Sequence, residues 1–517
     1  MRKIRNIFLK TVAFAAAAFM LAAAVSCSGA ESGAAEQEMS ETETPDAEYT
    51  PAPSPAFGSA EEAEEMIYAL RRTNFETGVY DRKAVLAFED ACVDAVQYLR
   101  HNKEDEDYLQ NCYALYAAMI SARDAVEYRK GDVPRVYITT YGGVAEDRYS
   151  KCTVSFVDKV NGTLDPVKDT AAQIKIRGNS TAGADKKPYN IKLSSDQNVF
   201  GMESGSKWAL LANHFDKTLI RNKLSLDFAA AAGVTAALDS RFAEVYLNGK
   251  LLGSYLVCEP VTDGKHRADI DVSAGEFMVE RVKAWASPAE NSVTTSRLKL
   301  RFDIEYYGGD PGAVEDVLNK AERAIISGDE SRIREYIDVD SFVSMYIVHE
   351  YLKDCDMTYG SSYLCYKNGV LWCGPLWDMD LSAGNVSVYH DEDKYRIYNN
   401  LPPFGDGSGD SASGIWARQD WFAYLCECPF FMELAKEKYA SLTPYIESLY
   451  AENGYIDSLA AEYGASFGRN YTDAGWDIRA HASPYESQTD YRTYEQALAE
   501  LKSWLERRHE YLKKAFE

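Results

Sequence analysis

The chain has 517 residues, with 55 Lys and Arg against 80 Asp and Glu, so its formal net charge is −25. This balance excludes a protein that wraps nucleic acid on a basic surface, and it argues against electrostatic adsorption to an anionic membrane. Hydrophobic residues make up 46% of the chain and aromatic residues 12%. That composition can bury a large core, so the chain as a whole is predicted to fold.

Residues 1–26 have the pattern of an export signal. Four basic residues and no acid stand in the first ten positions, and the uncharged run 11–25 follows. This run has secretory length and is too short for a comfortable membrane span. Small residues precede Cys27, as in the bacterial lipobox, so we expect a lipoprotein in which Cys27 carries the lipid. The alternative is an ordinary signal peptide with an incidental cysteine.

Two segments separate this signal from the first predicted strand. Residues 27–60 carry seven acids and no Lys or Arg, which predicts a disordered acidic tether between anchor and domain. Residues 61–130 begin with acids and then repeat apolar residues at helical spacing, so a small helical unit is expected there. The expected location is extracytoplasmic, with the membrane contacted through the lipid anchor only.

From Pro134 onward the pattern changes to short β-branched runs separated by Gly, Asn and Asp, which indicates strands. Asn248-Gly249, between two alternating runs, is the strongest hairpin signal in the chain. Residues 217–231 form an amphipathic helical pattern between strands. From Val314 helices dominate, including residues 338–353 and the C-terminal residues 493–516. The predicted fold class is therefore α+β, with a β-rich lobe before a helical lobe and a cleft between them.

Two motifs have residue types that suit phosphate or metal. Arg177-Gly178-Asn179-Ser180-Thr181 follows a predicted strand and precedes lysines on the next one, a plausible phosphate cradle whose alternative is a plain hairpin. Asp354, Asp356, Asp378 and Asp380 stand at helix and strand exits, where carboxylates suit Mg²⁺ unless they only cap helices and turns. His214 could serve as a base, although a lone loop histidine is more often structural.

Ten cysteines show no CxxC pair, so zinc ligation is not indicated and most are expected to be buried free thiols.

Six blocks in order resemble the CotH family, the spore-coat-protein-H-like atypical kinases. They are RGNST with KKPYNIKL, KWALLANHFDKTLIRNKLSLDFA, RFAEVYLNGKLLGSYLVCEPV, GEFMVERV, IDVDSFVSMYIVHEYLKDCD and GPLWDMDLSAGN. The terminal LKSWLERRHEYL is similar to the usual end of the family. The resemblance implies that residues 131–517 form a CotH domain with a divergent protein-kinase-like fold.

The resemblance also implies an activity: transfer of the γ-phosphate of ATP, with Mg²⁺ or Mn²⁺, to Ser or Thr of a protein acceptor. Asp356 would be the catalytic acid that orients the acceptor hydroxyl. Lys192 would be the strand lysine near the phosphates, with Lys187 the second candidate. Glu259 or Glu280 would pair with that lysine, and the sequence does not choose between them.

The remaining roles follow from the same blocks. Asp378 would bind metal, with Asp380 close by, and Arg177 and Asn179 match the glycine-bearing turn. One departure concerns Ser361, five residues after Asp356, where kinases carry a metal-binding Asn. A hydroxyl is a poorer Mg²⁺ ligand than an amide oxygen. The alternative function is therefore a catalytically weak or inactive surface protein that acts as a binding, adhesion or scaffold module.

Overall fold

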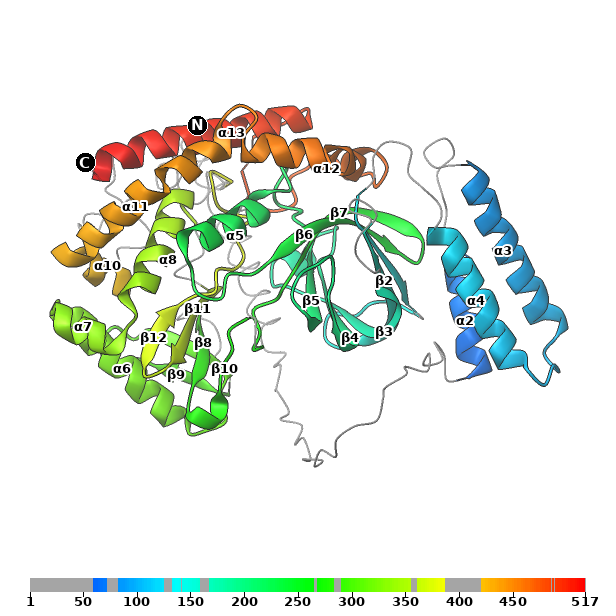
Figure 1. Ribbon diagram of the computed structural model, residues 1–517, viewed down its shortest axis with the longest axis horizontal. Helices are drawn as coiled ribbons and strands as arrows, with labels where there is room; N and C mark the ends of the chain where they lie inside the picture. Colours follow the sequence, from blue (N-terminus) through cyan, green and yellow to red (C-terminus); the bar gives the residue numbers. More distant parts are fainter. Residues whose placement is uncertain are drawn as a thin grey trace, which may run out of the picture.

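The computed structural model of the chain is shown in Figure 1. It describes residues 59–71, 82–124, 133–140, 142–158, 167–264, 267–282, 290–354, 360–385, 420–484, 486–487 and 489–516. The predicted export signal, Cys27, most of the tether and Asp356 lie outside these ranges.

Within the described ranges, three helices precede the first strand, in the stretch 61–130 where helices were expected. They are α2 (Ala60–Leu70), α3 (Arg82–His101) and α4 (Tyr108–Asp124). Their apolar faces pack on one another, with Phe88, Tyr116 and Met119 buried in a core of their own. The unit lies against the barrel described next (Figure 1), where the Tyr116 hydroxyl and Thr153 Oγ1 are 3.2 Å apart.

Seven strands form a closed barrel in the order β1-β2-β3-β4-β5-β7-β6. The strands are β1 (Arg135–Thr140), β2 (Ser150–Val157), β3 (Val167–Ile176), β4 (Tyr189–Gln197), β5 (Gly205–Leu211), β6 (Ser240–Leu247) and β7 (Lys250–Cys258). A parallel pair, β1 with β6, closes the barrel, and the other neighbours are antiparallel. Alternate residues such as Ile191, Leu193 and Val245 fill its interior.

The predicted hairpin is confirmed. Asn248 and Gly249 connect β6 to β7 with φ of 48° and 80°, and positive φ at both central residues is what a type I′ turn requires. The predicted β-rich lobe is thus a closed barrel. The two-lobe kinase arrangement implied by the family resemblance stays a prediction, while the α+β class is confirmed.

A second sheet has the strand order β12-β11-β8-β10-β9. Its strands are β8 (Phe277–Val282), β9 (Ser292–Thr294), β10 (Arg301–Tyr306), β11 (Ser362–Lys367) and β12 (Val370–Cys373). The central strand β8 pairs with β10 on one side and β11 on the other. This arrangement places Glu280 between Asp303 and Tyr363 in register.

Helices surround the second sheet and cover one side of the barrel (Figure 1). They are α5 (Arg221–Ala232), α6 (Pro311–Ser327), α7 (Glu330–Tyr336), α8 (Val339–Leu352), α10 (Trp421–Cys426), α11 (Pro429–Tyr450), α12 (Tyr455–Thr472) and α13 (Tyr494–Phe516). The two predicted helices at 338–353 and 493–516 are confirmed as α8 and α13. Asp338 caps α8 by accepting a hydrogen bond from the Ser341 amide, at 2.8 Å.

Helix α5 begins four residues later than the predicted start at Lys217. Asp216 accepts hydrogen bonds from the amides of Thr218 and Arg221, at 2.9 and 2.8 Å. Leu219 then takes a left-handed conformation, with φ of 64°. This side-chain-to-backbone turn competes with helix, so residues 217–220 form a loop instead.

Buried charges connect the barrel to the helices. Glu244 on β6 forms a buried ion pair with Arg469 on α12, and Phe242 packs edge-on against Phe467 at 4.9 Å between ring centroids. Because breaking a buried pair costs about 3–5 kcal/mol, this contact fixes how the helical part sits on the barrel. The sites described below lie beside this junction.

Within the described ranges, eight cysteines are free and seven of them are buried, as predicted. None of the helices found in those ranges combines the length and the apolar character needed to span a membrane.

Candidate functional site

The glycine-bearing turn begins where β3 ends. The Arg177 amide donates to the Pro188 carbonyl at 3.1 Å, which holds the two ends of the turn together. Gly178 has φ of 93°, and a Cβ at this position would stand 2.0 Å from Thr181 Oγ1. A residue with a side chain therefore does not fit. Asn179 is exposed at the tip of the turn.

Lys186 follows this turn, and its side chain is buried. Its ammonium group donates to the carbonyls of Ala212 and Ser254, at 2.7 and 2.6 Å, and lies 4.5 Å from the centroid of the Tyr255 ring. Both hydrogen bonds go to main-chain oxygens rather than to a carboxylate. Burial holds the pKa of Lys186 well below its usual range.

The two lysines predicted for the phosphates lie elsewhere. Lys187 is half-buried and donates to the Ala182 carbonyl at 2.8 Å, which ties it to the turn. Lys192 is exposed on β4, opposite Gln173 and Lys207 on the neighbouring strands. Ile191 and Leu193 point into the barrel, so the alternation of a strand directs Lys192 outward. The structure does not bring Lys192 to the other predicted residues.

The predicted glutamates are also separated from Lys192. Glu259, just after β7, is buried, accepts from the Asp239 amide at 2.9 Å and lies 3.7 Å from Arg267 Nε. Burial raises the pKa of Glu259, and Arg267 opposes that rise. Glu259 therefore belongs to an ion pair with an arginine, and neither Glu259 nor Glu280 is a partner of Lys192 in the contacts of the described chain.

Asp378 and Asp380 lie on an extended loop that follows β12. Asp378 has φ of 65°, a conformation that few residues with a side chain adopt, and Asp380 is buried. The Met379 amide between them donates to Asn222 Oδ1 at 2.8 Å. The Asp380 carbonyl accepts from Asn385 Nδ2 at 2.7 Å. Main-chain contacts at Met379 and Asp380 thus hold this loop where both aspartates line the pocket.

Arg221, the first residue of α5, fastens the same loop. Its guanidinium donates to the carbonyls of Ser382 and Ala383, at 3.1 and 3.2 Å, and forms a buried ion pair with Asp216. Arg221 is nine-tenths or more buried. The loop bearing the aspartates is therefore attached to the start of α5 at three points, counting the Met379 amide.

These segments converge on one pocket at the junction of barrel and helices. Its lining consists of Arg177, Thr181, Lys186, Pro188, Leu211, Ala212, Asn213, His214, Asn222, Asp378 and Asp380. The structure thus brings together Arg177, Asp378 and Asp380 of the residues named from the sequence, and it adds Lys186 and Asn222. No periodic pattern marks Lys186, which precedes β4.

His214 closes one side of this pocket. Its ring packs edge-on against Trp476, with 5.1 Å between the centroids. Burial, together with the charges of Lys186 and Lys217, lowers the pKa of His214 to about 3. His214 is therefore neutral near pH 7 and is a weak base.

Ser361 connects Glu280 to Asp378. The Ser361 amide donates to Glu280 Oε1 at 2.9 Å, and its hydroxyl donates to Asp378 Oδ2 at 3.4 Å. Burial raises the pKa of Glu280 to about 7, and the nearby charges of Glu305 and Asp303 add to the rise. Ser361 therefore links the carboxylates of Glu280 and Asp378.

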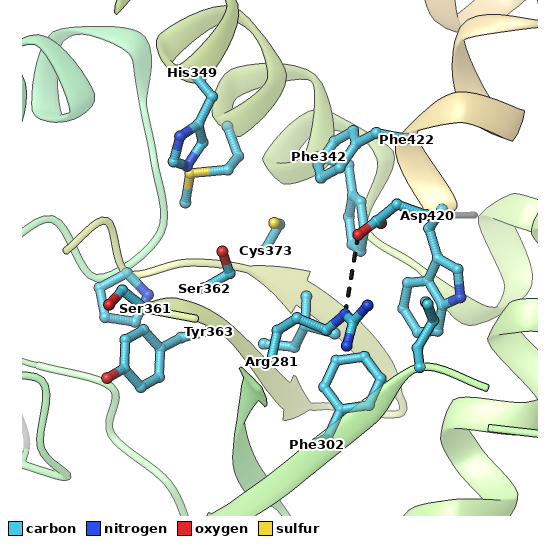
Figure 2. Close-up of a pocket in the computed structure, with 15 residues that line it drawn as sticks. Arg281, Phe302, Phe342, His349, Ser361, Ser362, Tyr363, Cys373, Asp420 and Phe422 are labelled. Carbon is cyan, nitrogen blue, oxygen red and sulfur yellow. Dashed lines mark ion pairs between the residues drawn. The ribbon is translucent and has the colours of Figure 1, made fainter. Parts of the chain in front are cut away.

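Ser361 also lines a second, mostly apolar cavity (Figure 2). The cavity has about 500 Å³ of empty space, open solvent included, and lies between the second sheet and helices α8 and α10. Figure 2 shows the Arg281–Asp420 ion pair, at 3.9 Å, on one side of it and Ser361 and Tyr363 on the other. Aromatic side chains such as Phe302, Phe342 and Trp421 line much of it, whereas most of the residues that line the other pocket are polar or charged.

Left-handed backbone conformations occur at and near the charged pocket, as they do elsewhere in the described chain. Asn213, Leu219, Ser361, Asp378 and Ala383 all have positive φ, between 47° and 65°. Each such residue costs on the order of 1–3 kcal/mol and persists only where surrounding contacts impose it, typically at functional sites. Asn213 and Asp378 line the pocket itself, and strain at these two positions favours a functional role for it.

The donor set suits a metal held jointly with phosphates. No group of three or more His, Cys, Asp or Glu side chains in the described part of the chain is placed to hold a metal ion by itself. Mg²⁺, however, commonly takes one or two carboxylates and completes its shell with phosphate oxygens and water. Asp378 and Asp380 supply the carboxylates, and Arg177 and Lys186 supply cationic groups for phosphates.

The family description "CotH kinase protein" matches residues 174–512, which is more than half of the chain. The chain belongs to the CotH family. Inner spore coat protein H of Bacillus subtilis (strain 168) is 26% identical over 217 residues. That match covers 41% of this chain and 58% of the Bacillus protein. The CotH match begins in β3, just before the turn at Arg177, and includes every residue of the charged pocket.

We expect Glu280 to make the CotH-family chain less stable as pH rises. The pKa of Glu280 in the folded state is about 7, above its ordinary 4.5, so this carboxyl binds more protons in the folded than in the unfolded state. The free energy of unfolding therefore falls as pH rises from about 4.5 to 7. Glu280→Gln keeps an acceptor for the Ser361 amide and removes the titration. Chemical unfolding should show Glu280→Gln gaining roughly 1–3 kcal/mol over wild type at pH 8 and nothing at pH 4.5.

Glu276→Gln is the matched control, because Glu276, just before the same strand β8, also accepts main-chain hydrogen bonds, from Asp271 and Asn368. An identical pH dependence of Glu280→Gln and wild type would show that Glu280 is ionised across this range.

Proposed function

We propose that the chain is an exported CotH-like atypical kinase that transfers the γ-phosphate of ATP, with Mg²⁺ or Mn²⁺, to Ser or Thr of a protein acceptor. One observation carries the proposal: Arg177 and Lys186 share a pocket with Asp378 and Asp380. Cations for phosphates and carboxylates for a metal are the two halves of a phosphoryl-transfer site. Membership of the CotH family supports the same reaction class.

The barrel side of the pocket is proposed to bind the nucleotide phosphates. Lys186 takes the place that the resemblance assigned to Lys192. Its two carbonyl partners and the Tyr255 ring hold its amino group in place, and a bound phosphate would favour the charged form that burial alone disfavours. The tight turn at Gly178 adds Arg177 and Thr181 from the same direction. Both hydrogen bonds of Lys186 go to main-chain carbonyls, so a phosphate oxygen is proposed as the anion that stabilises its charged form.

The helical side is proposed to hold the metal. Asp378 and Asp380 would bind Mg²⁺ or Mn²⁺, which neutralises charge on the phosphate oxygens when bound. Asn222 and Arg221 hold the main chain beside these aspartates, at Met379 and Ser382, so the carboxylates would not have to be organised when substrate arrives. This preorganisation is the contribution of the helical side to the reaction.

Asp356 is proposed to orient the acceptor hydroxyl. A bond forms between the acceptor oxygen and the γ-phosphorus, the bond from that phosphorus to the departing ADP oxygen breaks, and Asp356 accepts the hydroxyl proton. Asp354, two residues earlier, is buried and lies 3.2 Å from His349 Nδ1. This pair fixes the chain at the exit of α8, where the segment with Asp356 begins.

Ser361 favours the second candidate function, a catalytically weak or inactive binding module. Its hydroxyl is directed at Asp378 Oδ2, at 3.4 Å, so it engages a proposed metal ligand instead of standing free as a ligand itself. A second metal would then lack a good protein ligand at this position. The two candidates differ in turnover and not in nucleotide binding.

The chain is also proposed to act outside the cytoplasm, anchored to the membrane by lipid at Cys27. The basic first ten residues, the uncharged run that follows and the acidic stretch 28–60 support this proposal.

Phosphotransfer in vitro tests the catalytic proposal. Asp378→Asn keeps the size of the side chain and removes a metal-binding charge, so transfer from ATP to a Ser-containing acceptor, or to the chain itself, should fall about 100-fold. Lys186→Met should weaken ATP binding about tenfold, measured by calorimetry on protein shown to be folded. Lys192→Met is the matched control and should behave as wild type.

Nucleotide binding without turnover in wild type would favour the binding-module candidate. A loss in Lys192→Met with none in Lys186→Met would contradict the assignment of the phosphate lysine, and the absence of any ATP binding with either metal would remove the kinase proposal.

Replacement of Cys27 tests the anchor. Cys27→Ala removes the thiol that would carry the lipid, so the protein should move from the membrane to the soluble fraction and lose incorporation of labelled palmitate. Cys92→Ala is the control, since Cys92 is buried in the helical unit. Continued membrane attachment of Cys27→Ala would contradict the lipoprotein proposal.

A further inference from the structure

The side-chain amides of Asn213 and Asn222 form a directed chain of three hydrogen bonds that ends between the two pocket aspartates. Asn213 Nδ2 donates to the Leu219 carbonyl at 2.7 Å. Asn222 Nδ2 donates to Asn213 Oδ1 at 2.9 Å. Asn222 Oδ1 then accepts from the Met379 amide at 2.8 Å. Each link is a normal hydrogen bond by distance.

This chain determines how each amide is oriented. Because the Leu219 carbonyl can only accept, Asn213 must present its NH₂ to it, and its oxygen therefore faces Asn222. Asn222 must then present its NH₂ to Asn213 and its oxygen to Met379. If either side-chain amide were rotated by 180°, two donors or two acceptors would face each other inside the protein. Both asparagines are buried, so water does not relieve such a mismatch.

This chain of hydrogen bonds ends next to the two aspartates that are proposed to bind the metal. Met379 stands between Asp378 and Asp380, and its amide is the atom that Asn222 holds. Asp378 has φ of 65°, a conformation that a free loop would seldom keep. Asn222 itself lines the pocket with both aspartates.

We propose that Asn222, oriented by Asn213, is a positioning residue that keeps the Asp378 and Asp380 carboxylates preorganised for a divalent cation. Asn222 acts through the main chain of Met379 and not as a ligand, since its oxygen is already engaged. The inference rests on the proposed function only in treating Asp378 and Asp380 as the acids that hold the metal.

Three variants separate this role from general stability. Asn222→Ala removes the acceptor for the Met379 amide. Asn222→Asp keeps that acceptor but sets an oxygen against Asn213 Oδ1, so it tests the orientation of the chain. Asn319→Ala is the matched control, because Asn319 Oδ1 also accepts a main-chain hydrogen bond across to another segment, from Ser296 at 2.7 Å, and it does not line the pocket.

The measurement is Mn²⁺ binding to the folded protein without nucleotide, followed by electron paramagnetic resonance, with a thermal melt of each variant beside it. We expect Asn222→Ala and Asn222→Asp to raise the Kd for Mn²⁺ at least fivefold, while Asn319→Ala lowers stability without changing that Kd. Hydrogen exchange of the 376–385 segment should speed up in both Asn222 variants and not in the control.

Unchanged Mn²⁺ affinity in folded Asn222→Ala, an equal loss in Asn319→Ala, or no Mn²⁺ binding by wild type would each overturn the inference. If wild type binds Mn²⁺ and the Asn222 variants lose it while no variant transfers phosphate, the positioning role stands and the proposed kinase activity fails.

Discussion

The pocket depends on a buried ion pair between Asp216 and Arg221. Asp216 folds the residues after β5 into a turn by accepting the amides of Thr218 and Arg221, and Arg221 uses its other nitrogens to hold the carbonyls of Ser382 and Ala383. One guanidinium therefore joins the segment that leaves the barrel to the loop that bears Asp378 and Asp380. Removal of either partner would leave a buried charge unpaired, at a cost of about 3–5 kcal/mol.

This pair explains why the pocket lies where it does. The barrel contributes cations from the turn after β3, and the helical part contributes carboxylates from the loop after β12. Among the residues that line the pocket, the barrel supplies no carboxylate and the loop after β12 supplies no cation. Because Arg221 and Asn222 are consecutive on α5, the same helix start sets the position of the loop and the distance between its aspartates and Lys186. A site assembled in this way keeps its geometry only while the barrel and the helices stay packed.

Much of this arrangement could be predicted from the sequence, and the residues show where prediction ends. Alternating β-branched runs, the Asn248-Gly249 turn and the caps of α8 are local signals, and the structure confirms them. Asp378 and Asp380 were predicted because acids at a strand exit are also a local pattern. Lys192 was assigned by resemblance, although Ile191 and Leu193 on either side already indicate that it points outward.

Lys186, Arg221 and Asn222 were not predicted to act at the site because their roles depend on distant segments. Lys186 is buried by Ala212 and Ser254, and Arg221 meets a carbonyl 161 residues later in the chain. No periodicity connects such positions. The closure of the barrel through the parallel β1–β6 pair is likewise a long-range event, which the strand patterns alone did not specify.

The most direct test of the central account is a crystal structure of the protein with Mn²⁺ and a non-hydrolysable ATP analogue, with anomalous diffraction to locate the metal. The account predicts a manganese peak about 2.1–2.2 Å from a carboxylate oxygen of Asp378 or Asp380, with phosphate oxygens within hydrogen-bond distance of Lys186. Nucleotide bound away from this pocket, or metal bound without either aspartate, would contradict it.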